Sequence, residues 1–296
     1  MITRHSGHVA LMGRPNVGKS TLLNALVGEH LAIVTHKPQT TRHRILGLVS
    51  EERGQAAFVD TPGLHRRRDH ALNRRLNRIA ADTRQGVDLI VMVIEAGRWT
   101  EEDAMVLDLV AQHEGPTILA FNKIDLLDDR SELLKRTAEL TAQAEFVAVV
   151  YLSAEKKNGL GDLLDEVFRH LPEADPLYSE ELFTDRSERF LAAEMVREQL
   201  MLQLHQEIPY GLTVIIEKFE RQDRRIEIHG LIVVAEERHK GMVIGRQGQV
   251  LKRVGTRARH AIAELLGMPV HLELHVKTRS GWMDDEASLD ELGYAR

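Results

Sequence analysis

Apolar and polar positions change their spacing along the chain near residue 172. Before that point, short continuous apolar runs alternate with segments of helical spacing. The runs cover 44–49, 56–60, 88–95, 117–121 and 147–152, and the helical segments cover 101–112, 131–143 and 162–171. A parallel strand covered on both faces is typically a continuous apolar run. This alternation therefore predicts an α/β domain, a mostly parallel sheet with helices on both faces, in which the first two runs pair as a hairpin.

After residue 172 the order of elements is different. Two prolines and several acidic residues between 172 and 185 indicate a linker. A helical segment follows at 187–205, alternating apolar positions at 212–216 and 226–228, a helix at 250–266 and a last alternating strand at 270–276. We therefore expect a first domain at 1–174, a linker at 175–186, and an α+β domain with a C-terminal tail at 187–296.

A phosphate-binding loop stands at the start of the first domain. Gly13-Arg14-Pro15-Asn16-Val17-Gly18-Lys19-Ser20 matches the G-x-x-x-x-G-K-[ST] pattern, and Thr21 begins an apolar helical segment. An apolar strand candidate at 8–12 precedes it, which is the strand, turn and helix order that phosphate binding requires. Lys19 would reach the β- and γ-phosphates, and the Ser20 hydroxyl would ligate Mg²⁺. The pattern predicts a P-loop nucleotide-binding domain.

Two further segments contain residues that could bind Mg²⁺ and the γ-phosphate. Asp60-Thr61-Pro62-Gly63 follows a strand candidate, where Asp60 can hold Mg²⁺ through water and the Gly63 N–H can contact the γ-phosphate. The segment 38–42 lies between this motif and the phosphate loop. A threonine there could complete the metal coordination, and we favour Thr41 over Thr40.

The base specificity is predicted from Asn122-Lys123-Ile124-Asp125, which comes directly after a strand. Guanine presents two adjacent donors that one carboxylate can accept, and adenine does not, so Asp125 indicates guanine. Ser153-Ala154-Glu155, after the next strand, would approach guanine O6 through a backbone N–H. Each tetrapeptide alone is a common turn. Together, however, the phosphate loop and the four later motifs occur in the order expected of a guanine-nucleotide site, each after its own strand. The combination predicts GTP and GDP as ligands.

The second domain carries a basic loop and helix. Nine basic and only two acidic residues between 238 and 279 give that segment a charge of +7, so the remainder of the chain, whose total is −6, carries −13. Gly245-Arg246-Gln247-Gly248 lies in this segment and Lys252, Arg253 and Arg257 follow it. The glycines let backbone approach a sugar-phosphate chain. With the order of elements, this resembles a KH domain of the second topology type, which implies binding of single-stranded RNA.

Composition excludes several other classes of site. The chain has 296 residues and no cysteine, so disulfides and thiolate metal sites are excluded. The histidines are scattered and form no H-E-x-x-H pattern, so we expect no transition-metal site. No run of 18 apolar residues or signal-peptide pattern is present, and a cytoplasmic protein is expected.

The combination of motifs resembles the Era family of GTPases over nearly the whole chain. The matching segments are 13–21, Gln39 to Arg44, Asp60 to His65 and Ser280-Gly281-Trp282. The resemblance implies a GTPase in which the KH domain binds the 3′ end of 16S rRNA during 30S subunit assembly. It also implies GTP-dependent binding to and release from the 30S precursor, and peripheral association with the inner membrane. We expect a monomer.

The catalytic set departs from the pattern of better-known GTPases. Leu64 stands where related GTPases have Gln or His to orient water, with His65 one residue later, so we expect slow intrinsic hydrolysis. The resemblance implies that Asn16 holds a monovalent cation, K⁺, beside the phosphates. The predicted catalytic residues are Lys19, Asn16, Thr41 and Gly63.

Two alternatives remain open at this point. The chain could be a membrane-linked signalling GTPase in which the basic segment binds anionic lipid, although no lipidation motif is present. RNA could also be the substrate of a reaction, although the second domain shows no paired carboxylates or nucleophile.

Overall fold

The protein divides into two compact units. The first comprises Met1–Ala32, Thr41–Arg67 and Arg75–Asp185, and the second comprises Ile33–Thr40, Arg68–Arg74 and Arg186–Arg296. This computed structural model describes residues 3–37, 40–63, 70–83, 86–127, 129, 131–204 and 208–294. Each unit builds a candidate site of its own.

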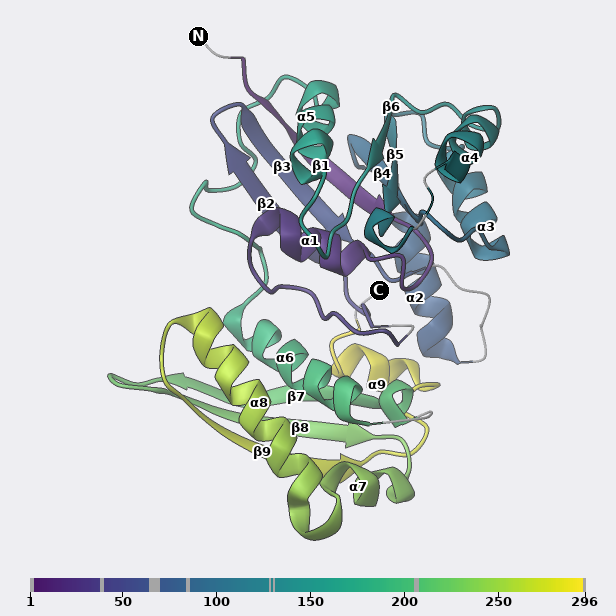
Figure 1. Ribbon diagram of the computed structural model, residues 1–296. Coiled ribbons are helices and arrows are strands. Elements are labelled where there is room, and N and C mark those ends of the chain that lie inside the picture. Colours follow the sequence, from purple (N-terminus) through teal and green to yellow (C-terminus); the bar gives the residue numbers. More distant parts are fainter. Residues whose placement is uncertain are drawn as a thin grey trace. The chain divides into compact units, whose positions relative to one another are not determined.

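A six-stranded sheet forms the centre of the first unit (Figure 1). Its strands are β1 (His5–Met12), β2 (Ile45–Glu51), β3 (Gly54–Asp60), β4 (Leu89–Glu95), β5 (Thr117–Asn122) and β6 (Ala148–Tyr151). The spatial order is β2-β3-β1-β4-β5-β6, and every pairing is parallel except the antiparallel β2–β3 hairpin. The predicted parallel sheet and its hairpin are both confirmed. The chain order reverses direction at β1, which is where α/β sheets place their ligands.

Helices cover both faces of this sheet. In Figure 1, α1 (Lys19–Val27) and α5 (Leu160–His170) lie on one face. On the other, α3 (Glu101–Val110) and α4 (Ser131–Thr141) pack on buried apolar residues of β1, β4 and β5. Two more helical segments precede residue 170, namely α2 (Ala71–Asp82) and the short η1 (Ile124–Leu126).

The segment expected to be a linker packs on the first unit. Leu48 N–H donates to the Phe183 carbonyl at 2.9 Å, and the Thr184 hydroxyl donates to the Leu46 carbonyl at 2.6 Å. Tyr178 N–H donates to the Gln55 side chain at 2.8 Å, and the Tyr178 ring covers apolar residues of β2 and β3. These contacts fix residues 178–184 against the β2–β3 hairpin, so they do not behave as a free connector.

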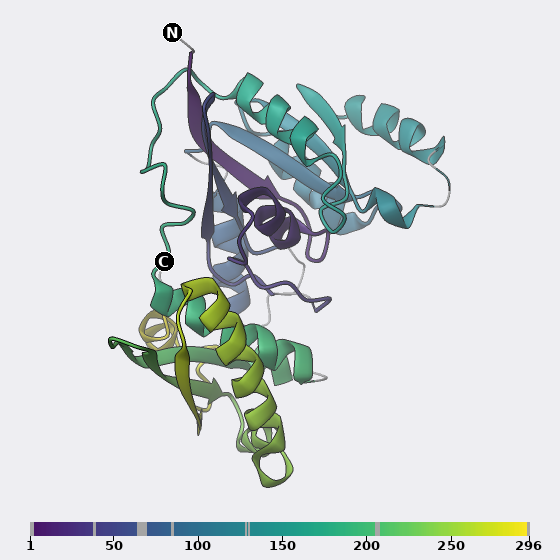
Figure 2. The same cartoon turned by 60° about the vertical axis from the view of Figure 1, so that its left-hand side comes forward.

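The second unit has the predicted order of elements. It contains α6 (Glu188–Gln203), η2 (Ile208–Gly211), β7 (Leu212–Arg221), β8 (Ile226–Val234), α7 (Glu237–Ile244), η3 (Arg246–Gly248), α8 (Gln249–Leu266), β9 (Val270–Thr278) and α9 (Glu286–Glu291). The sheet order is β7-β8-β9, with β7–β8 antiparallel and β8–β9 parallel. Figures 1 and 2 show α6 and α8 on one face of this sheet.

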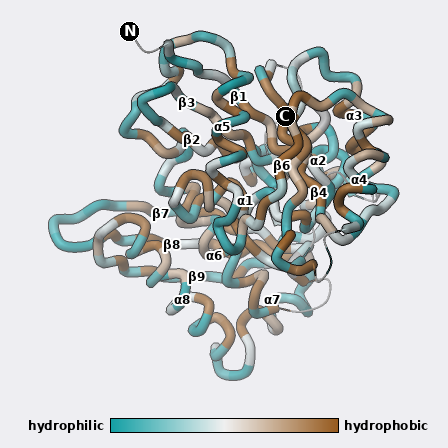
Figure 3. Tube along the Cα trace, turned by 45° about the horizontal axis from the view of Figure 1, so that its top comes forward, coloured by the Kyte–Doolittle hydropathy of each residue, from teal (hydrophilic) through white to brown (hydrophobic). Residues whose placement is uncertain are grey.

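The distribution of hydropathy follows these layers. Figure 3 shows hydrophobic stretches along strands such as β4, and a hydrophilic loop joining β7 to β8. On β9, His271, Glu273 and His275 alternate as exposed residues with half-buried apolar ones, as the sequence predicts. In the part of the chain that the structure describes, no helix combines the length and apolar character needed to cross a bilayer.

The C-terminal tail belongs to the core of the second unit. Trp282 and Tyr294 are both fully buried and stack with ring centroids 5.9 Å apart. The Tyr294 hydroxyl donates to the Thr213 hydroxyl at 2.9 Å, and the Trp282 ring N–H donates to the Gly211 carbonyl at 3.4 Å. The sequence indicates only a tail in this region, and the structure shows that its two aromatic rings complete the hydrophobic core.

Candidate functional site

The phosphate loop lies between β1 and α1, as predicted. Gly18 caps the start of α1 with φ of 102°, a left-handed conformation that favours glycine. A Cβ on Gly18 would also lie 2.2 Å from the Asn122 side-chain nitrogen, so the close approach itself requires glycine. The Lys19 ammonium donates to the Gly13 and Arg14 carbonyls at 2.8 and 3.0 Å. Lys19 is therefore held inside the loop that it would use to bind phosphate.

Burial governs the charge on Lys19. The side chain is 6% exposed, and the pKa of its ammonium is lowered to about 8, chiefly by burial. The charge of Asp60 acts in the opposite direction, and that of Arg14 adds to the effect of burial. A group that is desolvated in this way gains most from a bound polyanion, because a phosphate restores the charge partner that water no longer supplies.

Three side chains that carry oxygen atoms meet close to Lys19. The Ser20 hydroxyl donates to Asp60 Oδ2 at 2.6 Å and lies 2.8 Å from the Thr41 hydroxyl, which donates to the same Asp60 oxygen at 3.2 Å. The other Asp60 oxygen, Oδ1, is buried without a hydrogen-bond partner. Burial raises the pKa of Asp60, although Lys19 and the two hydroxyls act against it.

Thr40 and Thr41 differ in their surroundings. The Thr40 hydroxyl donates to the Lys37 carbonyl at 2.6 Å and lies 3.0 Å from the Thr35 hydroxyl. Of the two threonines, Thr41 is the one that joins Ser20 and Asp60.

The motif that follows Asp60 also approaches the phosphate loop. A Cβ on Gly63 would lie 2.6 Å from the Pro15 nitrogen, so the two backbones are in close contact. Thr61 donates through its hydroxyl to the Leu11 carbonyl at 3.2 Å, which ties this motif to β1.

The predicted guanine motif joins the phosphate loop through Asn122. Its side-chain N–H₂ donates to the Val17 carbonyl at 2.8 Å, and its oxygen accepts the Ala154 N–H at 2.9 Å. Asn122 therefore bridges the phosphate loop and the 153–155 segment. Asp125 stands exposed in η1, where its carboxylate is open to a ligand. Lys123 has φ of 65° and an ion pair to Glu95, a pairing that no local sequence pattern indicates.

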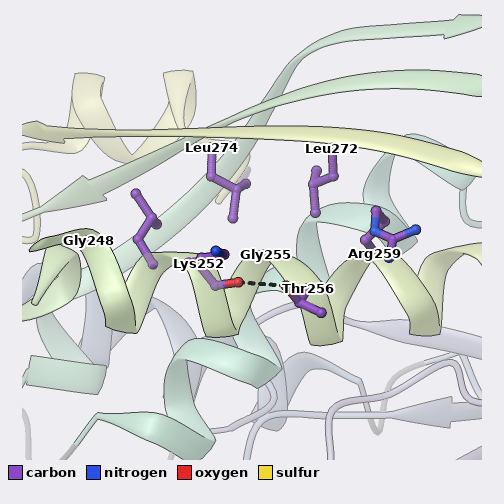
Figure 4. A pocket seen from close by; sticks show the side chains of 8 residues that line it. Gly248, Lys252, Gly255, Thr256, Arg259, Leu272 and Leu274 are labelled. Atoms are coloured by element: carbon purple, nitrogen blue, oxygen red, sulfur yellow. Dashed lines mark hydrogen bonds between the residues drawn. The ribbon is translucent and has the colours of Figure 1, made fainter.

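The second candidate site is the loop between α7 and α8 with the groove beside it. Gly245, Gln247 and Gly248 all have positive φ, and Arg246 and Gln247 are exposed. A groove of about 390 Å³ runs from this loop between α8 and β9 (Figure 4). Its lining residues are Gly248, Leu251, Lys252, Gly255, Thr256, Arg259, Leu272 and Leu274. The groove thus combines an apolar floor with cationic side chains, which suits a chain of bases and phosphates.

The predicted RNA-binding residues lie at different places relative to this groove. Gly248 and Lys252 line the groove, whereas Arg253 and Arg257 are exposed on α8 outside its lining. Arg259 does line the groove, although the predicted site did not include it. Helical spacing explains the difference, because positions 248, 252, 255 and 259 share one face of α8 and positions 253 and 257 do not.

Some of the residues named from the sequence lie outside the residues that the structure describes. They are Pro38, Gln39, Leu64 and His65. Among the residues that are described, no three His, Cys, Asp or Glu side chains gather as a metal site of that kind would require. The cluster of Ser20, Thr41 and Asp60 contains two hydroxyls and one carboxylate, so it is not a site of that kind. In the sequence, it was indicated only by the order of the motifs that carry these residues.

Comparisons with known proteins agree with both units. Residues 8–123 match the model of the 50S ribosome-binding GTPase family, and residues 207–283 match that of the KH domain. The chain is 48% identical over 289 residues to GTPase Era of Bordetella avium, covering 98% of this chain and 97% of that protein. The protein belongs to the Era family. It is therefore a GTPase with a P-loop domain and a C-terminal KH domain.

Other relatives extend this result. GTPase Era of Stenotrophomonas maltophilia is 49% identical over 290 residues, with the same coverage. The crystal structure of a single-substitution variant of Aquifex aeolicus Era, bound to GDP and AlF₄⁻, is 35% identical to this Era-family chain with a TM-score of 0.94, covering 99% of this chain and 100% of that one. A crystal structure of Era in complex with MgGDPNP and nucleotides 1506–1542 of 16S rRNA superposes with a TM-score of 0.95, 35% identity and the same coverage.

Proposed function

We propose that this GTPase binds the single-stranded 3′ end of 16S rRNA through its KH domain and acts in assembly of the 30S subunit. The observation that carries this proposal is the groove between α8 and β9, which starts at the G-x-x-G loop. The Era structure with 16S rRNA nucleotides supports the ligand, since it matches this chain along its full length. GTP binding would govern association with and release from the 30S precursor.

We assign the nucleotide-binding roles by the positions of the residues. Lys19 neutralises the β- and γ-phosphates from inside the loop, and Asp125 accepts both donors of the guanine base. Asn122 acts indirectly, since both ends of its amide hold backbone of neighbouring loops. The Gly63 N–H approaches the γ-phosphate, because its loop packs against Pro15.

Mg²⁺ fits the cluster of Ser20, Thr41 and Asp60. The unpartnered Asp60 Oδ1 is an anionic oxygen in a buried place, and hydroxyls and carboxylates are the ligands that Mg²⁺ takes in P-loop sites. Ser20 and Thr41 would hold the ion directly, and Asp60 through water. When bound, Mg²⁺ neutralises charge that develops on the β- and γ-phosphate oxygens. The protein's own part is to keep the three oxygens together before nucleotide arrives.

Turnover would depend on positioning rather than on a general base. With Leu64 in the place of a water-orienting side chain, we propose slow intrinsic hydrolysis, and Asn16 as the residue that holds K⁺ beside the phosphates. Asn16 has φ of 64°, which fixes its place in the loop. Catalysis would then rest on Lys19, Asn16, Thr41 and Gly63.

We further propose a cytoplasmic monomer that associates peripherally with the inner membrane. Its functional domains would be 1–174 and 187–296, joined by 175–186. The alternative of a membrane signalling switch without an RNA target predicts lipid binding by the same basic segment, and one experiment separates the two.

The experiment changes the loop charge and uses a matched control. Arg246→Asp with Gln247→Asp places two carboxylates in the exposed G-x-x-G loop. Gln222→Asp with Arg224→Asp makes the same charge change in the exposed β7–β8 loop. The β7–β8 loop lies near the C-terminal end of α8, since Ile226 N–H donates to the Pro269 carbonyl. The G-x-x-G loop lies at the other end of α8, which is about 27 Å long, so the control changes are far from that loop.

RNA affinity should fall by at least ~10-fold in the first variant, because like charges repel the phosphates, and change little in the second. Binding is measured by fluorescence anisotropy with a single-stranded 16S 3′-end oligonucleotide, beside flotation with anionic liposomes. Circular dichroism and GTP binding must stay normal in both variants. Equal RNA affinity of the folded first variant and the parent would overturn the RNA proposal. Loss of liposome binding alone would favour the signalling switch.

A further inference from the structure

Arg14 belongs to the phosphate loop, where an arginine would be expected to bind phosphate. Its side chain instead forms hydrogen bonds within the protein. It is 5% exposed, and its guanidinium donates to Asp103 Oδ2 at 2.9 Å through Nε and to Glu95 Oε2 at 2.9 Å through Nη2. A third donor, Nη1, reaches the Pro15 carbonyl at 3.2 Å. The planar guanidinium donates from three separate nitrogens in fixed directions, so one side chain can reach two carboxylates and a carbonyl at once. Arg14 therefore anchors the phosphate loop to two acidic residues far away in sequence.

The Asp103 end of this network is rigid. Asp103 is fully buried, and the oxygen that accepts from Arg14 also accepts the Thr100 N–H and the Thr100 hydroxyl, each at 2.8 Å. Together, Thr100 and Asp103 form a capping box at the start of α3. The carboxylate is thus fixed by the helix terminus, and through it Arg14 is fixed as well.

The Glu95 end leads to the guanine motif. The oxygen Oε2 of Glu95, at the end of β4, accepts from Arg14 and also lies 3.2 Å from the Lys123 ammonium. The Lys123 side chain is 29% exposed and the Glu95 side chain 22%, so this contact lies at the edge of the site. Burial would raise the pKa of Glu95, but hydrogen bonds and attraction from Arg14 and Lys123 bring it below its usual value. One carboxylate oxygen therefore connects two segments of the nucleotide site.

We propose that Glu95, held in place by Arg14, is a positioning residue that fixes Lys123 and links the guanine motif to the phosphate loop. A lysine side chain without an ion pair samples many rotamers, so it loses conformational entropy when a ligand orders it. Because Glu95 already holds the Lys123 ammonium, this entropy is lost on folding and not when a guanine nucleotide binds. Glu95 then controls how long GDP and GTP stay bound, and does not act on the phosphoryl-transfer step.

The decisive variant is Glu95→Gln. The amide keeps an oxygen that can accept from Arg14, and loses the charge that holds Lys123. The dissociation rates of fluorescent GDP and GTP analogues, measured by stopped flow, should both rise by roughly 10-fold, as expected for loss of a charge-assisted contact. The rate of single-turnover hydrolysis in the bound complex should stay within about twofold, because ΔG‡ from the bound state is not altered.

Glu166→Gln serves as the matched control. The Glu166 side chain is 23% exposed and also lies between two basic groups, Arg169 and His170, on α5. This substitution should leave both dissociation rates unchanged. Equal acceleration in Glu95→Gln and Glu166→Gln would show a general effect of surface charge and overturn the proposal.

A double-mutant cycle distinguishes positioning from simple structural support. Lys123→Met keeps an apolar stem and removes the ammonium, so it should speed dissociation by itself. Adding Glu95→Gln to Lys123→Met should then have little further effect. Multiplication of the two single effects would overturn the proposal, as would an unchanged dissociation rate in Glu95→Gln. If Glu95→Gln lowers thermal stability, the Lys123→Met single variant still tests the contact from its other side.

This inference rests on the proposed guanine role of residues 122–125, and a separate variant tests that role. Asp125→Asn should shift preference from guanine to xanthine nucleotides. Failure of that shift would remove the guanine assignment. A successful shift together with unchanged dissociation in Glu95→Gln would refute the positioning role alone.

Discussion

Replacing Gly255 by alanine should stabilise the second unit and weaken RNA binding at the same time. Gly255 lies inside the 18-residue helix α8, where glycine is about 1 kcal/mol less favourable than alanine. The nearest atom to a Cβ at this position would be Leu274 Cδ1 at 3.6 Å, an ordinary van der Waals contact. The fold therefore does not require glycine here. For a unit of this size, the gain corresponds to a rise in Tm of about 4 °C.

RNA binding should change in the opposite direction. Gly255 lines the groove between Lys252 and Thr256 on α8 and faces Leu274 on β9 (Figure 4). A methyl group would occupy space on the helix surface that a base or sugar needs in order to approach the backbone closely. We expect a loss of affinity of ~10-fold or more, comparable to losing one base-stacking contact of about 1–3 kcal/mol.

Calorimetric unfolding of the full chain and fluorescence anisotropy with single-stranded RNA measure the two effects. Gly241→Ala is the control, because Gly241 lies in helix α7, a Cβ added there would meet nothing within 4 Å, and it does not line the groove. It should stabilise the protein without changing RNA affinity. If Gly255→Ala binds RNA as tightly as Gly241→Ala does, the groove is not the RNA site. A fall in Tm would refute the packing argument instead.

The nucleotide site allows three further predictions. Asp125→Asn should lower GTP affinity several-fold to ~100-fold, since an unpaired polar group costs about 1–3 kcal/mol. The same substitution should raise the affinity for xanthosine triphosphate. Unchanged equilibrium binding of GTP would show that Asp125 does not belong to the site. Lys19→Ala should severely reduce GTP binding or hydrolysis in a phosphate-release assay, because a charge-assisted contact is lost, and parent-like turnover would contradict its role. Exchange of K⁺ for Na⁺ should slow hydrolysis in the parent but not in Asn16→Ala; equal parent rates in both salts would refute the cation role.

The sequence predicts the strands of the first unit well because their causes are local. A continuous apolar run such as the one that becomes β4 (Leu89–Glu95) is typical of a strand that is covered on both faces of a sheet. Each motif then follows its strand directly, so the carboxyl ends of the strands bring the motifs together. The KH order is likewise predictable, since alternation at β9 and the stop signal after α8 both act within a few residues.

Contacts between distant residues were not predictable. Arg14 forms hydrogen bonds with Glu95 and Asp103, which lie more than 80 residues away in the sequence. No local sequence pattern near these residues indicates the pairing. The same holds for Tyr178 on the β2–β3 hairpin and for the Trp282 ring N–H on the Gly211 carbonyl. A hydrophobic or charged side chain indicates only that it needs a partner. The topology of the folded chain selects which partner is near.

Thr40 and Thr41 show how far local reasoning extends. Two adjacent threonines have the same chemistry, and composition cannot choose between them. Neighbouring side chains leave the backbone in different directions, however, and only one of the two joins Ser20 and Asp60. In the structure it is Thr41, while the Thr40 hydroxyl turns to the Lys37 carbonyl.

Replacing Thr41 by alanine should therefore remove one oxygen of the proposed Mg²⁺ site without a substitute, because the Thr40 hydroxyl donates to the Lys37 carbonyl instead. A lost oxygen ligand weakens Mg²⁺ binding, so the Mg²⁺ concentration that gives half-maximal GTP hydrolysis should rise. A titration of Mg²⁺ in a phosphate-release assay measures this shift, and Thr41→Ser, which keeps the hydroxyl, is the matched control. If Thr41→Ala required no more Mg²⁺ than Thr41→Ser, the hydroxyl would have no part in holding the ion, and its hydrogen bond to Asp60 would serve only to support the loop.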